Sequence, residues 1–421
     1  SNFSTPDIYL RGVGTRDFTI GADLSIGFYV DDVYIGRAGN VFIDFFDLER
    51  IEILKGPQGT LWGRNAVAGA IHVISEKPSN EFKSKNQITY GNFDLFRLAG
   101  NISGPLVKNN LLGKFSYSIR NRDGYSKNSF DGEDLGDNES INARASLQYI
   151  PTDNTDIIIR LDYGKDRPTG VAFDSRIIGA PANGLGHIEP EGAFNVNINT
   201  PGREHRDYYG LSGDITSENN EILFKSISSF RGYKQNLIDD TDGTSFTLAR
   251  LPNIIDQTQF TQELRLSNKP DNKLKWLLGA YFFHEDIEND FTIDSSDLGA
   301  FDLISTNFSA LITNSYSLFG QASYSLTKRI NFTLGTRYIY EEKDFNIRRS
   351  GNALDGDFPL TRFNNDWQAF TPKVGLDFQQ TTDILWYASI SRGFRSGGFN
   401  ALQSVLQPGF DPELLLAYEL G

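Results

Sequence analysis

Along most of the chain, apolar and polar side chains alternate residue by residue. In the segment 331–341, Phe332 and Leu334 share one face of an extended strand, while Asn331 and Arg337 share the other. Successive side chains of a β-strand point to opposite faces, so such a segment separates an apolar environment from a wet one. This period-two pattern limits the chain to sheets that have one apolar and one polar face.

About fourteen segments show the pattern, and the connections between them alternate in length. The segments lie near 86–91, 94–104, 111–121, 140–150, 155–166, 207–217, 221–234, 258–267, 273–285, 315–327, 330–343, 368–379, 383–392 and 413–421. Short connections occur at 104–110, 151–154, 217–220, 269–272 and 380–382. Long polar connections are expected at 122–139, 167–206, 235–257, 286–314, 344–367 and 393–412.

The strict exchange of short and long connections indicates an up-and-down antiparallel sheet. Structureless loops longer than about 15 residues are uncommon in compact soluble domains. Short turns at one end and long loops at the other are the layout of outer-membrane barrels, whose strand ends often carry interfacial aromatics such as Tyr149, Tyr163 and Trp386. A soluble β-sandwich or propeller is the alternative, since its strands also alternate in polarity, but it lacks the short–long exchange.

Composition narrows the classes of protein further. The net charge of −14 argues against non-specific nucleic-acid binding, which needs a basic face. Aromatic residues make up 13% of the chain, which argues against disorder. Cys is absent, which excludes a disulfide framework, and no run of about 18 apolar residues indicates a transmembrane helix. Met is absent too, which together with the missing leader predicts a processed, trimmed or fragmentary chain.

The first 80 residues differ from the rest in the spacing of their glycines and apolar residues. Closely spaced glycines separate short apolar runs at 8–10, 28–30, 51–54 and 70–74. These runs predict the strands of a compact α/β unit, and the polar stretch after Pro78 predicts a linker to the alternating region.

These N-terminal motifs resemble the plug domain of TonB-dependent receptors. Ile8–Gly14 is similar to the family's IRGVG strand, and Tyr29–Tyr34 to its YVDGVY strand. The longest match is Leu48–Asn65, which resembles LERIEVLRGPQGTLYGRN, and Ala68–Ser75 follows it as a counterpart of GGAINIIT. Downstream, Ser391–Asn400 and Tyr418–Gly421 resemble later barrel strands of the family.

The resemblance implies a mainly β fold, namely a transmembrane antiparallel β-barrel with an α/β plug inside its lumen. We expect the plug at 1–80 and the barrel at 81–421. Barrels of the family have 22 strands and about 14 are visible, so both ends are expected to be truncated. The resemblance further implies an outer-membrane location in a Gram-negative bacterium, contact with lipid, and energy supplied by the TonB–ExbB–ExbD complex, whose binding segment is not in the chain.

In the family, plug loops that face the outside contact the ligand. By position these loops are Thr15–Leu24 and Gly36–Asn40, which makes Arg16, Phe18, Arg37 and Asn40 the expected ligand-binding residues. Arginine offers a planar donor fork to carboxylate or catecholate oxygens, and aromatic rings offer stacking surfaces. Each of these residues could instead bond within the plug.

Weaker candidates lie in the longest expected loop. His187, Arg203, His205 and Arg206 carry groups suited to an anionic ligand or a metal chelate. Lys55 stands where the family usually has an arginine that pairs with barrel carboxylates, and Glu419 is its candidate partner.

No arrangement of residues predicts catalysis, a metal site or a cofactor. His72 reads as structural, and Gly56–Gly59 lacks the Lys-Ser/Thr of a phosphate-binding loop and therefore reads as a turn. The resemblance favours import of a ferric siderophore or other iron complex driven by the proton-motive force. Cobalamin, oligosaccharides and other chelates remain alternative ligands. A passive porin or adhesin barrel and a soluble carbohydrate-binding β-protein remain alternative classes.

Overall fold

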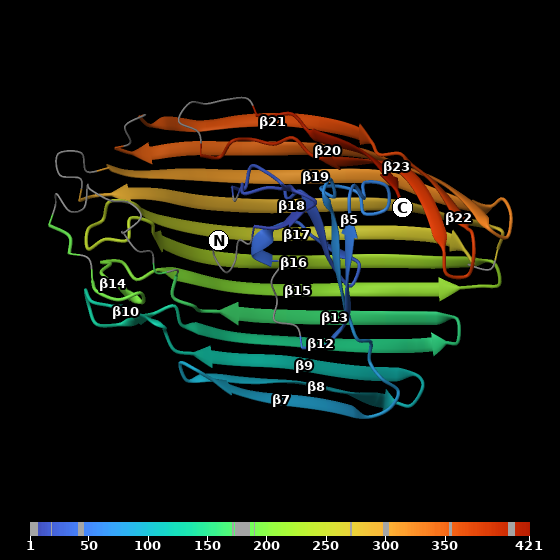
Figure 1. The fold of residues 1–421 in the computed structure, drawn as a ribbon, viewed down its shortest axis with the longest axis horizontal. Coiled ribbons are helices and arrows are strands. Elements are labelled where there is room, and N and C mark those ends of the chain that lie inside the picture. The colour runs from blue at the N-terminus through green and yellow to red at the C-terminus, as the bar shows by residue number, and fades with distance from the viewer. Residues whose placement is uncertain are drawn as a thin grey trace.

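The computed structural model describes residues 7–17, 19–40, 46–170, 172, 186–188, 190–269, 272–297, 303–352, 356–402 and 409–421. Within these residues the largest sheet has 15 strands and curves around an inner N-terminal unit (Figure 1). We call the large sheet the barrel sheet and the inner unit, which comprises the described residues up to 80, the plug.

The barrel sheet is antiparallel throughout, and each strand pairs with its neighbours in chain order. Its strands are β7 (Lys83–Gly91), β8 (Leu95–Val107), β9 (Leu111–Arg122), β12 (Asn138–Thr152), β13 (Thr155–Asp166), β15 (Arg203–Glu218), β16 (Ile222–Asp240), β17 (Arg250–Asn268), β18 (Leu274–Ser295), β19 (Leu303–Ser325), β20 (Ile330–Gly351), β21 (Phe358–Phe370), β22 (Lys373–Gln379), β23 (Leu385–Arg395) and β24 (Glu413–Leu420). Each segment predicted from the sequence coincides with a strand, and the segment at 368–379 covers the end of β21 together with β22.

β21 and β22 are two halves of one transmembrane passage. Both pair with β20, β21 beside its far part and β22 beside its first part. Pro372 separates them, and a proline has no N–H to give to a sheet ladder. The neighbouring groups remain bonded, because Thr371 N donates to Arg337 O and Pro372 O accepts from Arg392 N.

Three of the expected long connections are wrong, because strand structure occupies most of them. β16 and β17 leave only 241–249 between them, β18 and β19 leave 296–302, and β20 and β21 leave 352–357. The strands continue past the length of about ten residues that crosses a bilayer. The pairing of β18 with β19 continues there, with Asp286 opposite Ile312 and Thr292 opposite Thr306. A polar sequence alone therefore does not indicate a loop.

The two ends of the sheet nevertheless differ, as expected. We call the end with turns 153–154, 219–221 and 326–329 the short-turn end, and the opposite one the long-connection end; they lie at the right and left of Figure 1. At the long-connection end, β10 (Ser126–Asn128), β11 (Asp134–Leu135) and β14 (Asn195–Val196) form a small separate sheet.

The plug is built on a four-stranded sheet of order β4-β3-β6-β5, with a separate pair β1-β2. Its elements are β1 (Tyr9–Leu10), β2 (Val13–Gly14), β3 (Ile26–Val30), β4 (Val33–Ile35), the 3-10 turn η1 (Ala38–Asn40), β5 (Leu48–Lys55) and β6 (Gly69–Ser75). The strands match the expected apolar runs. The helical part of the expected α/β unit is limited, in the described residues, to η1.

A two-residue turn joins β3 to β4. Asp31 and Asp32 have φ angles of 49° and 68°, the left-handed conformation that type I′ hairpin turns need and that aspartate tolerates. The turn places both carboxylates against the barrel sheet, where Arg144 approaches Asp31 and Lys225 bonds Asp32.

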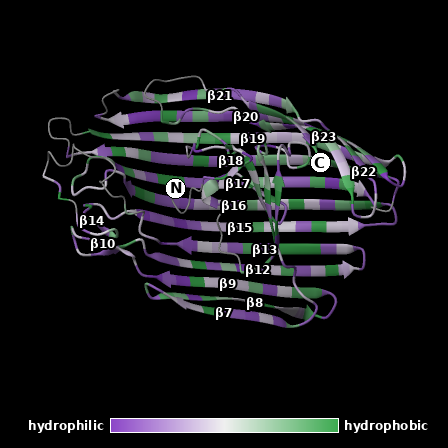
Figure 2. Ribbon diagram, viewed as in Figure 1, coloured by the Kyte–Doolittle hydropathy of each residue, from purple (hydrophilic) through white to green (hydrophobic). Residues whose placement is uncertain are grey.

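The two faces of the barrel sheet differ in polarity along every long strand. On β20, for example, Arg337, Glu341 and Lys343 are buried against the plug, while Leu334 on the outer face is 54% exposed. Figure 2 shows the resulting alternation of hydrophilic and hydrophobic bands along the strands. An exposed apolar face and a buried polar one invert the usual arrangement of a soluble protein and fit a sheet that faces lipid outside and water inside.

In the described part of the chain, no helix combines the length and the apolarity that crossing a membrane requires.

Candidate functional site

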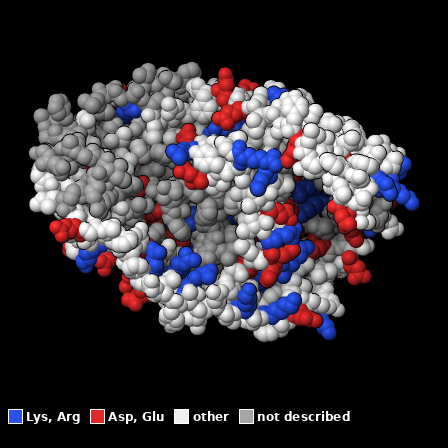
Figure 3. Space-filling model, in the orientation of Figure 1, with Lys and Arg blue, Asp and Glu red and all other residues white. Residues whose placement is uncertain are grey.

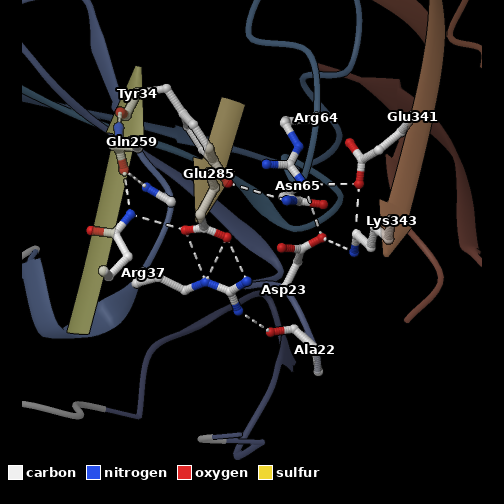
Figure 4. Close-up of polar contacts among 12 residues, drawn as sticks. Ala22, Asp23, Tyr34, Arg37, Arg64, Asn65, Gln259, Glu285, Glu341 and Lys343 are labelled. Carbon is white, nitrogen blue, oxygen red and sulfur yellow. Dashed lines mark hydrogen bonds and ion pairs between the residues drawn. The ribbon is translucent and has the colours of Figure 1, made fainter. Parts of the chain in front are cut away.

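The plug and the barrel sheet meet through buried charged side chains. Two arginines of the plug, Arg37 and Arg64, point toward Glu285 of β18 and Glu341 of β20 (Figure 4). Arg37 is held in place by the turn that follows β4, and Arg64 by the turn region between β5 and β6. The plug therefore presents cations from two irregular segments to carboxylates fixed on the rigid sheet.

Arg37 and Glu285 form a bidentate ion pair. Arg37 Nη2 lies 2.6 Å from Glu285 Oε2, and Nε lies 3.0 Å from the same oxygen. The third donor, Nη1, reaches Ala22 O at 2.9 Å. Both side chains are almost fully buried. Burial would lower the pKa of Arg37, but the Glu285 carboxylate more than offsets it and holds that pKa above its ordinary value.

Arg64 belongs to a four-member cluster of alternating charge. Its Nη2 lies 2.8 Å from Glu341 Oε1 and 3.1 Å from Asp23 Oδ2, and Lys343 Nζ lies 2.8 Å from the same Asp23 oxygen. Burial would raise the pKa of Asp23, but Lys343 and Arg64 outweigh it and hold the pKa of that carboxyl well below its usual range. The ring of Phe283 closes one side, with Arg64 Cζ 4.4 Å from its centroid.

Neutral groups and further ion pairs complete the contact. Gln259 of β17 bonds the plug backbone twice, accepting from Gly36 N at 3.0 Å and donating to Tyr34 O at 2.7 Å. On other sides the charges are reversed, with barrel lysines holding plug aspartates; Lys114 lies 2.8 Å from Asp47. In Figure 3 acidic and basic side chains gather together in the hollow beside the plug.

This contact is tight but chemically exchangeable. A buried ion pair gains little over a well-packed apolar contact, while removal of one partner costs about 3–5 kcal/mol because a charge is left buried alone. Water can replace each partner in turn, which it cannot do for an apolar core. The plug is therefore held to the barrel sheet by contacts in which water can take the place of either partner.

A small cavity lies at the long-connection side of this contact. It measures about 60 Å³ and lies between the plug loop Thr15–Leu24 and barrel residues that include Tyr233 and Ile255. Arg16 lines it with a side chain that is 79% exposed, and its closest carboxylate, Asp7, is 4.0 Å away. Arg16 therefore keeps donors available to a ligand.

The other expected ligand residues of the plug are placed differently. Arg37 also lines the cavity, but Glu285 and Ala22 engage its guanidinium, so we reassign Arg37 to the plug–barrel contact. Asn40 is 1% exposed, and its side-chain amide has no hydrogen-bond partner among the described residues. Phe18 lies outside the described residues.

The weaker candidates are dispersed, because 203–206 form the start of β15 instead of a loop. Arg206 points inward, donating to Asp166 at 3.0 Å and to Gly39 O of the plug at 2.6 Å. Arg203 and His205 alternate with it and lie on the outer face of the strand. His187 is buried, and its Nδ1 accepts from Ser245 N at 3.1 Å. The structure does not bring the four together.

Glu419 does contact the plug, but through another residue than expected. Arg11 Nη2 lies 2.8 Å from Glu419 Oε1, whereas Lys55, at the end of β5, forms no ion pair among the described residues. The sequence reasoning also missed Glu285 and Glu341. In the sequence, each of these two glutamates is marked only as an acidic residue on the polar face of a strand. Many other positions have the same property.

His72 has a structural role in the plug. Its Nε2 accepts from Asp32 N at 3.0 Å, which requires a neutral ring with a lone pair on that nitrogen. Burial lowers the pKa of His72, against the opposing attraction of Asp32 and Glu52. The described residues contain no group of three or more His, Cys, Asp or Glu side chains that could hold a metal ion.

Two family models match the chain. Residues 1–70 match the TonB-dependent receptor plug domain, and residues 84–421 match the TonB-dependent receptor-like β-barrel. Among curated proteins, the pesticin receptor of Yersinia pestis is 24% identical over 430 residues, covering 100% of this chain and 59% of that protein. The metal-pseudopaline receptor of Pseudomonas aeruginosa is 22% identical over 415 residues, covering 90% of this chain and 54% of that protein.

Solved structures of the same kind share the fold. The ferric yersiniabactin uptake receptor of Yersinia pestis superposes with a TM-score of 0.82 at 20% identity, covering 100% of this chain and 63% of that one. The ferripyoverdine receptor of the outer membrane of Pseudomonas aeruginosa gives 0.73 at 16% identity, covering 100% and 56%. The chain thus spans about six tenths of the length of these relatives.

Proposed function

Because this chain belongs to the TonB-dependent receptor family, we propose that it imports a scarce extracellular ligand across the outer membrane of a Gram-negative bacterium. The observation that carries the proposal is the plug–barrel contact. A folded plug closes the lumen through buried ion pairs such as Arg37–Glu285, so passage needs work to rearrange them. We place the boundary between plug and barrel at residues 80 and 81.

The energy comes from outside the chain in this proposal. The TonB–ExbB–ExbD complex, driven by the proton-motive force, pulls the plug and lets water replace its partners in the lumen. The apolar outer face of the barrel sheet contacts lipid and stays fixed while the plug moves. A passive pore is the less favoured class, because a plug held by buried charges would obstruct it.

A ferric siderophore or other iron complex is the favoured ligand. The relatives' names refer to ferric yersiniabactin, ferripyoverdine and metal–pseudopaline. Arg16, with its exposed guanidinium at the long-connection side, offers charge-assisted hydrogen bonds to an anionic oxygen of such a ligand. Cobalamin and oligosaccharides remain alternative ligands to be tested.

Uptake by whole cells tests the proposal. Cells that express the protein should accumulate radioactive iron from one or more ferric chelates of a panel, and an uncoupler of the proton-motive force should stop it. Accumulation that survives the uncoupler would exclude energised transport. Substitution of Arg16 by Gln should weaken ligand binding several-fold, roughly the loss of one charge-assisted bond, whereas Arg203→Gln on the outer face should leave it unchanged.

A further inference from the structure

A second and larger cavity lies between the plug and the barrel sheet, toward the short-turn end. It measures about 270 Å³ and is lined by the plug's Trp62 and His72 and by residues of β17 to β20. Arg265 and Leu277 of its lining lie within a few residues of the turn that joins β17 to β18. The cavity therefore lies beyond the Arg64 cluster for anything that enters from the long-connection end.

Aromatic rings form much of the cavity wall. Tyr29 and Trp62 meet edge to face with centroids 4.6 Å apart, and Trp62 meets His72 at 5.1 Å. Tyr281 and Phe319 line the barrel side. Such walls favour flat, polarisable ligands, which gain both burial and ring contacts.

Arg337 of β20 brings a positive charge to this aromatic wall. Its residue is 2% exposed, and its guanidinium carbon lies 4.7 Å from the Phe319 centroid. Its hydrogen bond to the plug is long, 3.4 Å from Nη1 to Leu61 O, and its Nε has no hydrogen-bond partner among the described residues. No ion pair involves Arg337 among the described residues. A buried cation without an ion-pair partner is costly, so Arg337 is the group of this lining that gains most from an anionic ligand.

The other charged groups of the lining are already paired. Glu263, whose field reaches Arg337, lies 2.5 Å from Arg265 Nε. Asp32 bonds Lys225, and Arg64 belongs to the cluster with Asp23 and Glu341. Glu52 pairs with Arg50, whose Nε lies 2.7 Å from Glu52 Oε1. These pairs leave Arg337 as the charge that a ligand would neutralise.

Two further features indicate a site shaped for a ligand. Tyr281 lines the same cavity, and its buried hydroxyl has no hydrogen-bond partner among the described residues. Gly63 has a φ of +78°, and a Cβ there would lie 2.4 Å from Arg337 Cζ, so the plug backbone can lie directly against the guanidinium only because residue 63 is glycine. Arg337 and Tyr281 therefore line a space that the plug itself helps to enclose.

We propose that this cavity is an internal binding site for a flat aromatic carboxylate, with its carboxylate on Arg337 and Tyr281 and its ring against Trp62 and Phe319. This role rests on the proposed function: the site holds an aromatic acid group of the imported ligand after the ligand has passed the plug loop that carries Arg16. Arginine gives the planar fork that a carboxylate matches in two hydrogen bonds.

Binding of 4-fluorobenzoate to the purified protein in detergent, followed by fluorine NMR, tests this site. The expected result is saturable binding that unlabelled benzoate displaces. Arg337→Gln should raise the dissociation constant roughly tenfold or more, as for the loss of a charge-assisted hydrogen bond, and Tyr281→Phe should raise it a few-fold. Arg348→Gln, on the outer face of the same strand, is the matched control and should leave it unchanged.

Several outcomes would overturn the site. Unchanged affinity for the probe in both Arg337→Gln and Tyr281→Phe would contradict the proposed site. Tyr281→Phe deletes only a hydroxyl, so it keeps the test valid if Arg337→Gln fails to fold. Displacement by sulfate as readily as by benzoate would show an inorganic-anion site and overturn the aromatic class.

The site and the proposed function fail separately. Arg337-dependent binding in a protein that imports no iron chelate would uphold the site and reject the transport function. Iron import by a protein whose probe binding does not depend on Arg337 would uphold the transport function and reject the site.

Discussion

At the scale of single residues, the central feature is that each buried charge of the plug has a barrel partner that is distant in sequence. Arg37 and Glu285 are 248 residues apart, and Arg64 and Glu341 are 277 apart. The sequence motifs located the plug arginines, but pairing them requires the register of the barrel strands. The expected pair Lys55–Glu419 was wrong for the same reason: the sequence does not show that Arg11, and not Lys55, lies beside Glu419.

Replacing Glu285 with Gln should loosen the plug. The substitution leaves the Arg37 guanidinium buried without a counter-charge, which costs about 3–5 kcal/mol. We expect the amides of 26–40 to exchange hydrogen faster, as measured by mass spectrometry. Glu288→Gln, on the outer face of the same strand, is the control. Equal protection in the two variants would show that the ion pair does not hold the plug.

The pH dependence of the plug should include a contribution from Asp32. Burial would raise its pKa, but Arg265 and Lys225 lower the pKa to about 2 from an ordinary value of 3.8. A depressed carboxyl pKa gives stability that is complete above the unfolded-state value and is lost as the pH falls toward the folded-state value. The difference corresponds to about 2 kcal/mol.

We therefore expect plug protection to fall between about pH 4 and pH 2, and Asp32→Asn to lose this part of the dependence. Chemical denaturation of the plug at several pH values measures it. The prediction is wrong if Asp32→Asn keeps the full acid dependence of the unmodified protein.

At the scale of elements, the sequence predicted where strands exist better than where they end. Period-two contrast between apolar and polar residues located the membrane-crossing part of each strand. Beyond that part the outer face is wet, so Asp286, Glu288 and Asp290 face out while Ile287 and Asn289 face in. Polar residues on the outer face remove the contrast, and the extensions of β18 and β19 therefore resemble loops in sequence.

Hydrogen exchange distinguishes an extended strand from a loop at these positions. Amides of 286–295 and 303–314 should be protected to nearly the same degree as those of the membrane-crossing parts, because the ladder continues through them. Amides of the exposed turn 326–329 should exchange far faster. Rapid exchange throughout 286–314 would restore the long loop expected from the sequence.

At the scale of the whole molecule, the two faces of the barrel sheet suit two different environments, lipid outside and water inside. The outer face carries exposed apolar side chains, and the interior carries ion pairs and amides around the plug, as the buried polar residues of β20 show. This explains why a chain that is only 39% hydrophobic forms a membrane fold. The motifs at Leu48–Asn65 predicted the plug, whereas the cavity at Arg337 could not be predicted, since it exists only between plug and wall.

A charged side chain on the outer face of the barrel sheet should destabilise the fold. Leu318 of β19 is 67% exposed on that face, and its replacement by Arg should cost about 2–4 kcal/mol if it lies near the bilayer midplane. Folding into lipid vesicles, followed by denaturant titration, measures the loss. Leu318→Ala should cost clearly less. Equal stability of the Arg variant and the unmodified protein would place this face away from lipid.

Movement of the plug against the barrel is tested most directly by tying the two together. The chain has no cysteine, and a Cβ on Gly335 of β20 would lie 2.9 Å from Thr60 Cγ2 of the plug, so a Thr60→Cys/Gly335→Cys pair is close enough for a disulfide. We expect the oxidised pair to bind ligand at the cell surface but to import none, with import restored by a reductant and unaffected in either single-cysteine variant. Import at the unmodified rate through the oxidised protein would contradict the proposed rearrangement of the plug.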